Sequence, residues 1–176
     1  MSVSGTFTVA LSETFGDRFR HNEPLAGHVT AQIGGPADIW LPVKTIDELV
    51  TAITLTRHYG IPFFILGGGA NLLIRDAGIR GVVVQNQAGQ VWFPAEATEA
   101  GDTALMRVAS GAILPNLVRR CVTRGLSGLE WAVGVPGTIG GAVVNNAGAY
   151  GSNMAENLSR VELLSPQNQR QWYPTE

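Results

Sequence analysis

Two clusters of glycine constrain this chain more than any other feature of its sequence. The chain has 22 glycines among 176 residues, and they gather at Gly67–Gly69 and between Gly134 and Gly151, next to apolar segments. A flexible linker would instead spread its glycines through a polar segment. Clustered glycines between ordered segments indicate tight turns or a close approach of the backbone to another group. We therefore expect two segments of this kind within an ordered protein.

The overall composition favours a folded protein and argues against several functional classes. Apolar residues make up 45% and charged residues 15%, so a chain of this length can form one domain or two small lobes that share a cofactor. The net charge is -2 and no run of Lys or Arg is present, which argues against a nucleic-acid surface. The N-terminus lacks the pattern of a signal peptide, and no segment approaches the ~20 apolar residues that span a bilayer. We expect a cytoplasmic protein without membrane insertion.

The thiol and the imidazoles of this chain do not indicate a metal site. Cys121 is the single cysteine and falls on an apolar helical stripe, so we interpret it as a buried core thiol rather than a reactive one. His21, His28 and His58 do not have the spacing of metal ligands. We therefore expect no bound metal.

Sequence periodicity predicts an α+β fold with one helix in each of two lobes. One helix follows Thr45, whose spacing to Glu48 is that of a capping box, and ends at Gly60; the other begins near Leu114 and ends at Gly125. Strands are predicted at 31–43 (a pair broken at 34–36), 61–66, 81–86, 91–94, 105–110, 161–164 and 170–173. The predicted domain boundaries are 1–21 for an N-terminal arm or short helix, 22–88 for the first lobe and 89–176 for the second.

The first glycine cluster has the properties of an anion-binding loop. Three successive glycines follow the apolar strand at 61–66, and without Cβ atoms their N–H groups can surround a phosphate. A tight turn without a ligand is the alternative. The dinucleotide fingerprint fails because Leu72 stands where its third glycine would be, and the nucleoside-triphosphate loop fails because no Lys is nearby. A pyrophosphate bound here would therefore be held by another fold.

The second glycine cluster, 134–151, consists mostly of small residues without charge. A flat aromatic ring could lie against such a surface and bond to backbone groups and to Asn amides. The alternative is a tightly packed loop that crosses the core. Asn145, Asn146 and Tyr150 favour the ligand, since buried polar groups need partners that a ligand could supply.

Four segments together resemble the UDP-N-acetylenolpyruvoylglucosamine reductase family, also called UDP-N-acetylmuramate dehydrogenases. The matching segments, in order, are 30–38, 65–73, 125–130 and 134–151. Each is weak alone, but their shared order and spacing are specific. The resemblance runs from about Asn22 to the C-terminus and concerns the N-terminal FAD-binding portion of the family.

This resemblance implies a two-lobed FAD-binding module of the vanillyl-alcohol-oxidase (PCMH) type, without the substrate domain. It implies non-covalent FAD, NADPH as co-substrate, and reduction of UDP-N-acetylglucosamine enolpyruvate to UDP-N-acetylmuramate for peptidoglycan, and hence for cell shape and division. The implied contacts to the pyrophosphate are Gly67, Gly68, Gly69, Ala70, Asn71 and Leu72. Those along the flavin are Val135, Pro136, Gly137, Gly141, Ala142, Asn145 and Gly148.

The family's catalytic groups have no counterpart in this chain. The family uses a Tyr-Arg pair and a distant Glu at the substrate carboxylate and a Ser as proton donor, and none of these motifs occurs within 1–176. We therefore assign no catalytic residue and expect the chain alone to be inactive. For Tyr150 we predict a contact to substrate, with a core ring as the alternative.

Two other functional classes stay open. The chain could be a non-catalytic flavin-binding protein, or a fragment that needs a partner chain. It could also be another flavin oxidase of the wider fold, although no His or Cys stands at 67–71 to form a covalent flavin link.

Overall fold

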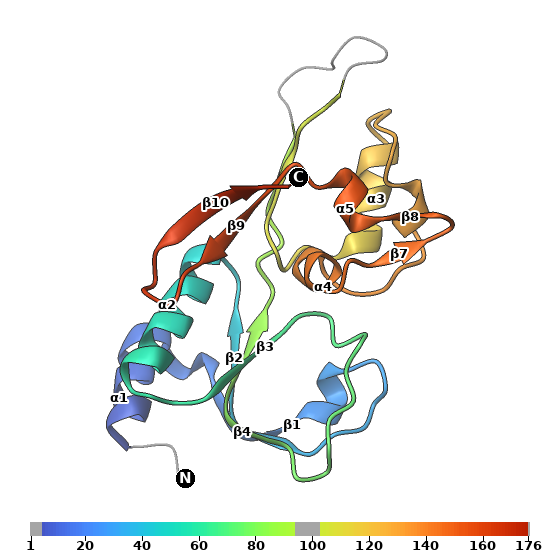
Figure 1. The fold of residues 1–176 in the computed structure, drawn as a ribbon. Coiled ribbons are helices and arrows are strands. Elements are labelled where there is room, and N and C mark those ends of the chain that lie inside the picture. The colour runs from blue at the N-terminus through green and yellow to red at the C-terminus, as the bar shows by residue number, and fades with distance from the viewer. Residues whose placement is uncertain (1–4, 94–102, 176) are drawn as a thin grey trace. The chain divides into compact units, whose positions relative to one another are not determined.

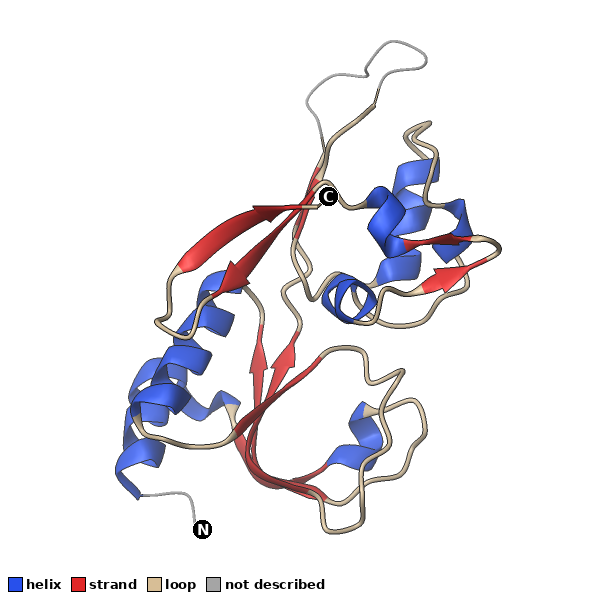
Figure 2. Cartoon of the chain, in the orientation of Figure 1, coloured by secondary structure: helices blue, strands red, loops and turns tan. Residues whose placement is uncertain are grey.

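The computed structural model describes residues 5–93 and 103–175, which form two compact units (Figure 1). Unit 1 is Met1–Gln87 and unit 2 is Ala88–Glu176. Each unit has helices, strands and a hydrophobic core of its own (Figure 2). Within the described ranges, no helix has the length and apolar character needed to cross a membrane.

Unit 1 is built on a four-stranded sheet in the order β1-β2-β4-β3. Its strands are β1 (Arg20–Pro24), β2 (Pro36–Val43), β3 (Phe63–Leu66) and β4 (Ile79–Asn86). Strand β1 pairs with β2 in the antiparallel sense, whereas β2 and β3 both run parallel to β4. The central strand β4 is rich in Val, as expected for a strand whose two faces are both covered.

Both faces of the two middle strands, β2 and β4, are mostly buried. On one face, Ile39 and Leu41 of β2 and Val82 of β4 pack against α1 (Gly5–Phe15) and α2 (Ile46–His58). On the other, Trp40 and Val83, which alternate with them in the strands, pack against the short helix η2 (Leu25–His28) and the segment after β3. Figure 1 shows α1 and α2 on one side of the sheet and η2 on the other. The segment that follows β3 is thereby packed against this face of the sheet.

Helix α2 begins as the sequence predicts. The Thr45 hydroxyl accepts the N–H of Glu48 at 3.1 Å, and the Glu48 carboxylate accepts the N–H of Lys44 at 2.7 Å and pairs with Arg18 at 2.9 Å. Burial raises the pKa of Glu48, but these hydrogen bonds and the Arg18 charge outweigh it, so the pKa lies below its usual value of 4.5. The helix start is therefore stabilised by an ionised carboxylate.

The described residues of unit 2 form short helices and three two-stranded sheets. Its elements are β5 (Val91–Trp92), β6 (Arg107–Val108), α3 (Leu114–Val122), η3 (Glu130–Ala132), α4 (Ile139–Val144), β7 (Gly148–Ala149), β8 (Ser152–Asn153), α5 (Met154–Asn157), β9 (Arg160–Leu164) and β10 (Arg170–Pro174). Its core joins Leu114 and Val118 of α3 to Trp131, Ala142 and Met154.

Helix α3 confirms the second predicted helix. Pro115 lies in its first turn, and Leu117, Val118 and Cys121 face the core. Cys121 is buried as predicted, and burial raises the pKa of its thiol. The hairpin predicted at 161–164 and 170–173 is also present, as antiparallel β9 and β10.

The structure differs from three predictions about elements. Helices α4 and α5 stand beside α3, where one helix was predicted for the second lobe, whereas α1 lies within residues 1–21, where an arm or short helix was predicted. Residues 31–35 do not form a strand, since Gln32 (φ 55°) and Gly34 (φ 144°) take conformations that a strand excludes. The strands expected at 91–94 and 105–110 are two residues long where they are described, and Pro94 lies outside the described residues.

Candidate functional site

The glycine cluster at 67–69 forms a loop directly after β3. Gly69 has φ 66°, and a Cβ atom there would overlap the carbonyl oxygen of His28 and lie 2.7 Å from the Cα of Val29. The N–H of Thr30 donates to the Gly69 carbonyl oxygen at 3.1 Å. Gly69 is therefore required by the packing of the chain itself, and it joins the loop to the segment after η2.

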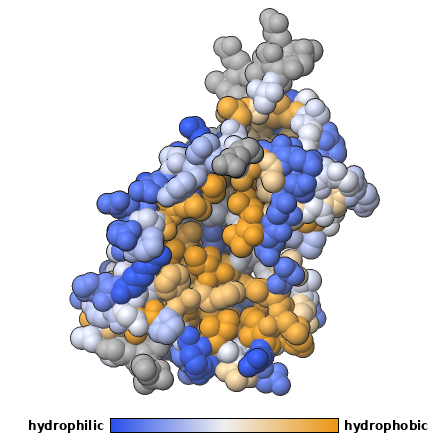
Figure 3. Space-filling view, viewed as in Figure 1, coloured by the Kyte–Doolittle hydropathy of each residue, from blue (hydrophilic) through white to orange (hydrophobic). Residues whose placement is uncertain are grey.

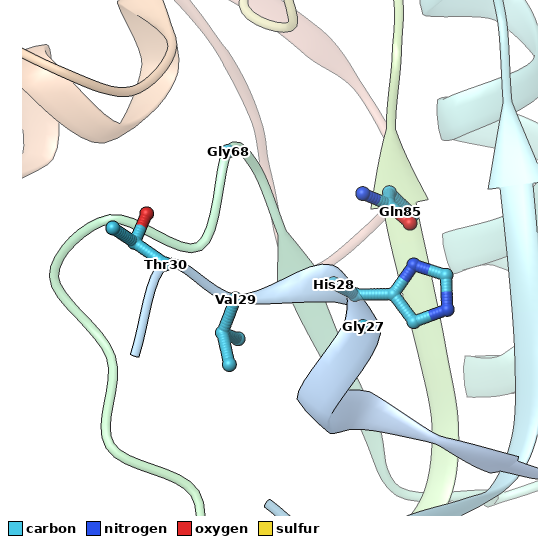
Figure 4. Close-up of a pocket in the computed structure, with 6 residues that line it drawn as sticks. All are labelled: Gly27, His28, Val29, Thr30, Gly68 and Gln85. Carbon is cyan, nitrogen blue, oxygen red and sulfur yellow. The ribbon is translucent and has the colours of Figure 1, made fainter. Parts of the chain in front are cut away.

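A pocket of about 300 Å³ lies beside this loop (Figure 4). It is lined by Gly27, His28, Val29, Thr30, Gly68 and Gln85. Figure 4 shows the Gln85 amide and the His28 ring on one side of it and Thr30 and Gly68 on the other. Hydroxyl, amide, imidazole and backbone groups can all bond to oxygen-rich ligands. The pocket thus suits a polar group rather than an apolar one.

The other predicted loop residues differ in exposure. Gly68 and Asn71 are exposed, while Leu72 is half-buried and packs against the core on the η2 side of the sheet. The Leu72 side chain therefore anchors the loop in the core. Only the backbone of Leu72 could contact a ligand.

In unit 2, the second cluster contains helix α4, which the sequence analysis did not predict. The Thr138 hydroxyl caps this helix by accepting the N–H of Gly141 at 3.4 Å. The N–H of Gly140 donates to Ser110 O at 2.7 Å, and a Cβ on Gly140 would lie 3.0 Å from the same oxygen. Gly148 is equally confined, since its Cβ would lie 2.9 Å from Ser152 O. These two glycines have structural roles.

Gly134 and Gly141 differ from them because they face open space. A Cβ on Gly134 would meet nothing within 4 Å, and one on Gly141 would touch the Thr138 hydroxyl alone, at an ordinary 3.6 Å. Gly141 lies in α4, where glycine costs about 1 kcal/mol relative to alanine. Hydrophobic side chains are exposed at both ends of this stretch, at Val133 and Val144. Hydrophobic residues in general form much of the visible face of the chain (Figure 3). A group from outside the chain can therefore approach this backbone closely.

The prediction that Asn145 and Asn146 are buried polar groups in need of a ligand was wrong. Both residues are exposed rather than buried. Asn145 donates to Gly141 O at 2.8 Å, and the Asn146 side-chain oxygen accepts the N–H of Ala155 at 2.9 Å. Their side chains therefore hold the turns after α4 and do not lack partners that a ligand must supply.

Tyr150 is 90% exposed, so its interpretation as a core ring was wrong. It lies between β7 and β8, with φ 53°, and is followed by Gly151 with φ 84°. Two positive φ values in a two-residue hairpin loop are typical of a type I′ turn. The turn directs the ring away from the unit.

Comparison with known proteins places the chain in a family. A family model described as an FAD binding domain matches residues 37–171. The chain belongs to this family of FAD-binding domains. It is a mixed α/β domain of the PCMH type found in vanillyl-alcohol-oxidase-like flavoproteins.

Within this family, the chain is similar to UDP-N-acetylenolpyruvoylglucosamine reductases. It is 41% identical to that of Rubrobacter xylanophilus over 82% of this chain and 47% of the relative. It is 38% identical to that of Desulfosudis oleivorans over 91% of this chain and 51% of the relative. The chain thus spans about half the length of these curated relatives and is related to their N-terminal FAD-binding portion.

Solved structures agree with this FAD-binding fold. The Thermus caldophilus reductase aligns with a TM-score of 0.68 at 33% identity, covering 89% of this chain and 53% of that one. An alkyldihydroxyacetonephosphate synthase aligns with a TM-score of 0.71 at 16% identity, covering 98% of this chain and 34% of that one. The second likeness concerns the fold alone.

The part of this FAD-binding domain that lies under the glycine loop could not be predicted from the sequence. His28 and Gln85 line the pocket next to Gly68, yet neither belongs to a recognisable spacing pattern. Thr30 stands within a matching segment, but its backbone bond to Gly69 is a tertiary contact. Across 5–93 and 103–175, no three His, Cys, Asp or Glu side chains are grouped so as to hold a metal ion.

Proposed function

We propose that this chain binds FAD non-covalently, as the flavin-binding part of a reductase that uses NADPH to convert UDP-N-acetylglucosamine enolpyruvate to UDP-N-acetylmuramate. The relatives carry the name of that reductase and share 38–41% identity with this chain. The product is a precursor of peptidoglycan, and we propose a cytoplasmic location.

The proposed flavin surface rests on the two glycines that face open space, Gly134 and Gly141. The chain's own packing explains Gly140 and Gly148 but not Gly134 and Gly141, whose missing side chains leave room outside the chain. Glycine at such positions permits a ligand to reach backbone N–H and C=O groups. We propose that the flavin lies along Val135, Pro136, Gly137, Gly141, Ala142, Asn145 and Gly148.

The proposed site for the diphosphate of FAD is the glycine loop after β3. Successive N–H groups that point to one side of a loop bind anions, and Gly68 is exposed next to a pocket with polar lining. We propose that Gly67, Gly68, Gly69, Ala70, Asn71 and Leu72 hold the pyrophosphate through their backbone.

When bound, FAD would supply hydride transfer from NADPH to the enolpyruvyl double bond. The N–H groups of the glycine loop would offset the charge of the diphosphate, and the residues around α4 would hold the ring and keep water from it. We propose that the exposed Tyr150 contacts the substrate. In a longer relative that carries this hairpin, Tyr150→Phe should raise KM more than it lowers FAD content.

The decisive test separates FAD binding from folding. Gly141→Ala should leave the free energy of unfolding unchanged or raise it by up to about 1 kcal/mol, because alanine favours a helix. The same methyl group should weaken FAD binding at least tenfold, measured by quenching of flavin fluorescence. Gly68→Val should abolish binding by blocking the loop.

A matched control is Gly5→Ala, since Gly5 is a helical glycine of α1 that also faces open space. It should leave FAD affinity unchanged. Equal affinity of the Gly141→Ala and Gly5→Ala chains for FAD would contradict the proposed flavin surface.

A further inference from the structure

A connected set of side chains lies beneath the glycine loop in unit 1. His28 Nε2 is 2.9 Å from Glu23 Oε1, and its ring lies 4.7 Å from the Trp40 ring at 33°. The Trp40 indole N–H donates to Gln85 Oε1 at 2.8 Å, and Arg20 both pairs with Glu23 at 3.0 Å and lies 5.2 Å from the Trp40 ring. These five residues, here called the His28 network, join β1, η2, β2 and β4.

The network holds a carboxylate that is half-buried at the edge of the sheet. The Glu23 side chain is 16% exposed, and that of His28 is 17% exposed. The hydrogen bond with His28 is the main cause that lowers the pKa of Glu23, with Arg20 adding to it against the opposing effect of burial. Glu23 is therefore ionised and fixed, and the His28 ring is fixed by it on one edge and by Trp40 on one face.

The backbone of His28 in turn touches the loop. Gly69 packs so closely on the carbonyl group of His28 that a Cβ atom would overlap its oxygen. Two residues later, the Thr30 N–H bonds to the Gly69 carbonyl at 3.1 Å. A movement of His28 would therefore be passed directly to Gly69. The pocket between His28, Gln85 and Gly68 would change with it.

We propose that His28 is the positioning residue of the glycine loop: its links to Glu23 and Trp40 fix the segment 28–30, against which Gly67–Gly69 takes the shape that binds a diphosphate. This inference rests on the proposed function, because it presupposes that the loop binds the diphosphate of FAD. Loops that bind anions through backbone N–H groups depend on those groups being directed in advance, since ordering them on binding costs affinity. His28 therefore affects how well the loop binds the diphosphate of a dinucleotide. It is not proposed to affect binding of the flavin ring.

The alternative is that Leu25 fixes the segment without help. Leu25 is fully buried in the core at the start of η2. It holds the beginning of that helix, however, whereas His28 stands at its end, next to the contacts with Gly69. If Leu25 were sufficient, removing the His28 side chain would leave the loop unchanged.

The test measures FAD and FMN binding by the full 176-residue chain and its variants. His28→Phe keeps a ring against Trp40 but loses the bond to Glu23, and it should raise the Kd for FAD about tenfold. FMN lacks the diphosphate, so its Kd should change less than twofold. His28→Gln, whose amide can still donate to Glu23, should recover part of the loss. Glu23→Gln should weaken FAD binding, and its combination with His28→Phe should be no worse than the stronger single change.

The control is His58→Phe, an equivalent change at the end of α2, which should alter neither Kd. In the chain without FAD, amide hydrogens of 67–72 should exchange faster in His28→Phe than in His58→Phe, which tests the loop directly. Unchanged FAD affinity in His28→Phe, or an equal loss of FAD and FMN affinity, would overturn the inference while leaving the proposed function intact. Failure of the unaltered chain to bind FAD would instead overturn the proposed function, and the inference with it.

Discussion

At the residue scale, Tyr150 occupies a backbone conformation that suits asparagine or glycine better. Its φ of 53° is left-handed, which costs a residue other than glycine about 1–2 kcal/mol. Asparagine tolerates this conformation, so Tyr150→Asn should raise the free energy of unfolding by about 1 kcal/mol, measured by urea denaturation. Tyr150→Phe should have no such effect, because it keeps the same backbone preference. A Tyr150→Asn chain no more stable than Tyr150→Phe would show that the turn is not strained.

Individual residues also show how far the sequence could be interpreted. Thr45, Pro115 and Cys121 were predicted correctly because their roles depend on neighbours a few positions away. His28 was not, since its partners Glu23, Trp40 and the Gly69 backbone come together through three-dimensional packing. The same holds for Asn145, whose exposure depends on a helix that the sequence did not reveal.

At the element scale, the starts of β2 and β4 depend on a close backbone contact between the two glycine-containing segments that precede these strands. We call this contact the crossing. A Cβ on Gly35 would overlap the carbonyl oxygen of Asp76, and one on Gly78 would overlap that of Pro36. Gly78→Ala should therefore destabilise unit 1 by more than the ~1 kcal/mol expected from its positive φ alone. Gly60→Ala is the matched control, because Gly60 has a similar φ, 64° against 73°, but open space around it. Equal loss of stability in the two variants, measured by thermal unfolding, would contradict the crossing.

The elements that were predicted incorrectly have physical explanations. Helix α4 contains two adjacent glycines, which lower its helix propensity, but a Thr138 cap and the burial of Ala142 stabilise it. Segment 31–35 has the residue types of a strand, yet the crossing at Gly35 forces it out of the sheet. In both cases tertiary contacts outweigh local preference.

At the scale of the whole molecule, acid should act first on unit 1. Glu23 and Glu48 both have a pKa below 4.5 in this unit. A carboxylate with a lowered pKa in the folded state stabilises the protein above its unfolded-state pKa, and this stability is lost as the pH falls through the folded-state value. Below about pH 4.5, hydrogen exchange should therefore report loss of protection in 5–87 before 103–175. Replacing both residues by Gln should flatten this pH dependence, and an unchanged slope would argue against the assignment.

The second prediction at this scale concerns catalysis. We predict that the 176-residue chain alone does not reduce the enolpyruvyl sugar, because the Tyr-Arg, Glu and Ser groups that the resemblance implies for this chemistry have no counterpart in its sequence. Loss of one electrostatic group typically costs about 10²–10³ in rate, and loss of the proton donor about 10²–10⁴. We expect at most slow NADPH oxidation that is not coupled to the sugar. An anaerobic assay with FAD, NADPH and the sugar tests this, and stoichiometric product at an enzyme-like rate would place the chemistry within these residues.

The crossing of Gly35 and Gly78 has a kinetic consequence. The two backbones are separated along the chain by β2, α2 and β3, so this contact has a high sequence separation. Closing such a loop loses chain entropy before the contact gives any stability. The crossing should thus form after the rate-limiting barrier to folding. A methyl group at position 78 should then accelerate unfolding while leaving the refolding rate nearly unchanged.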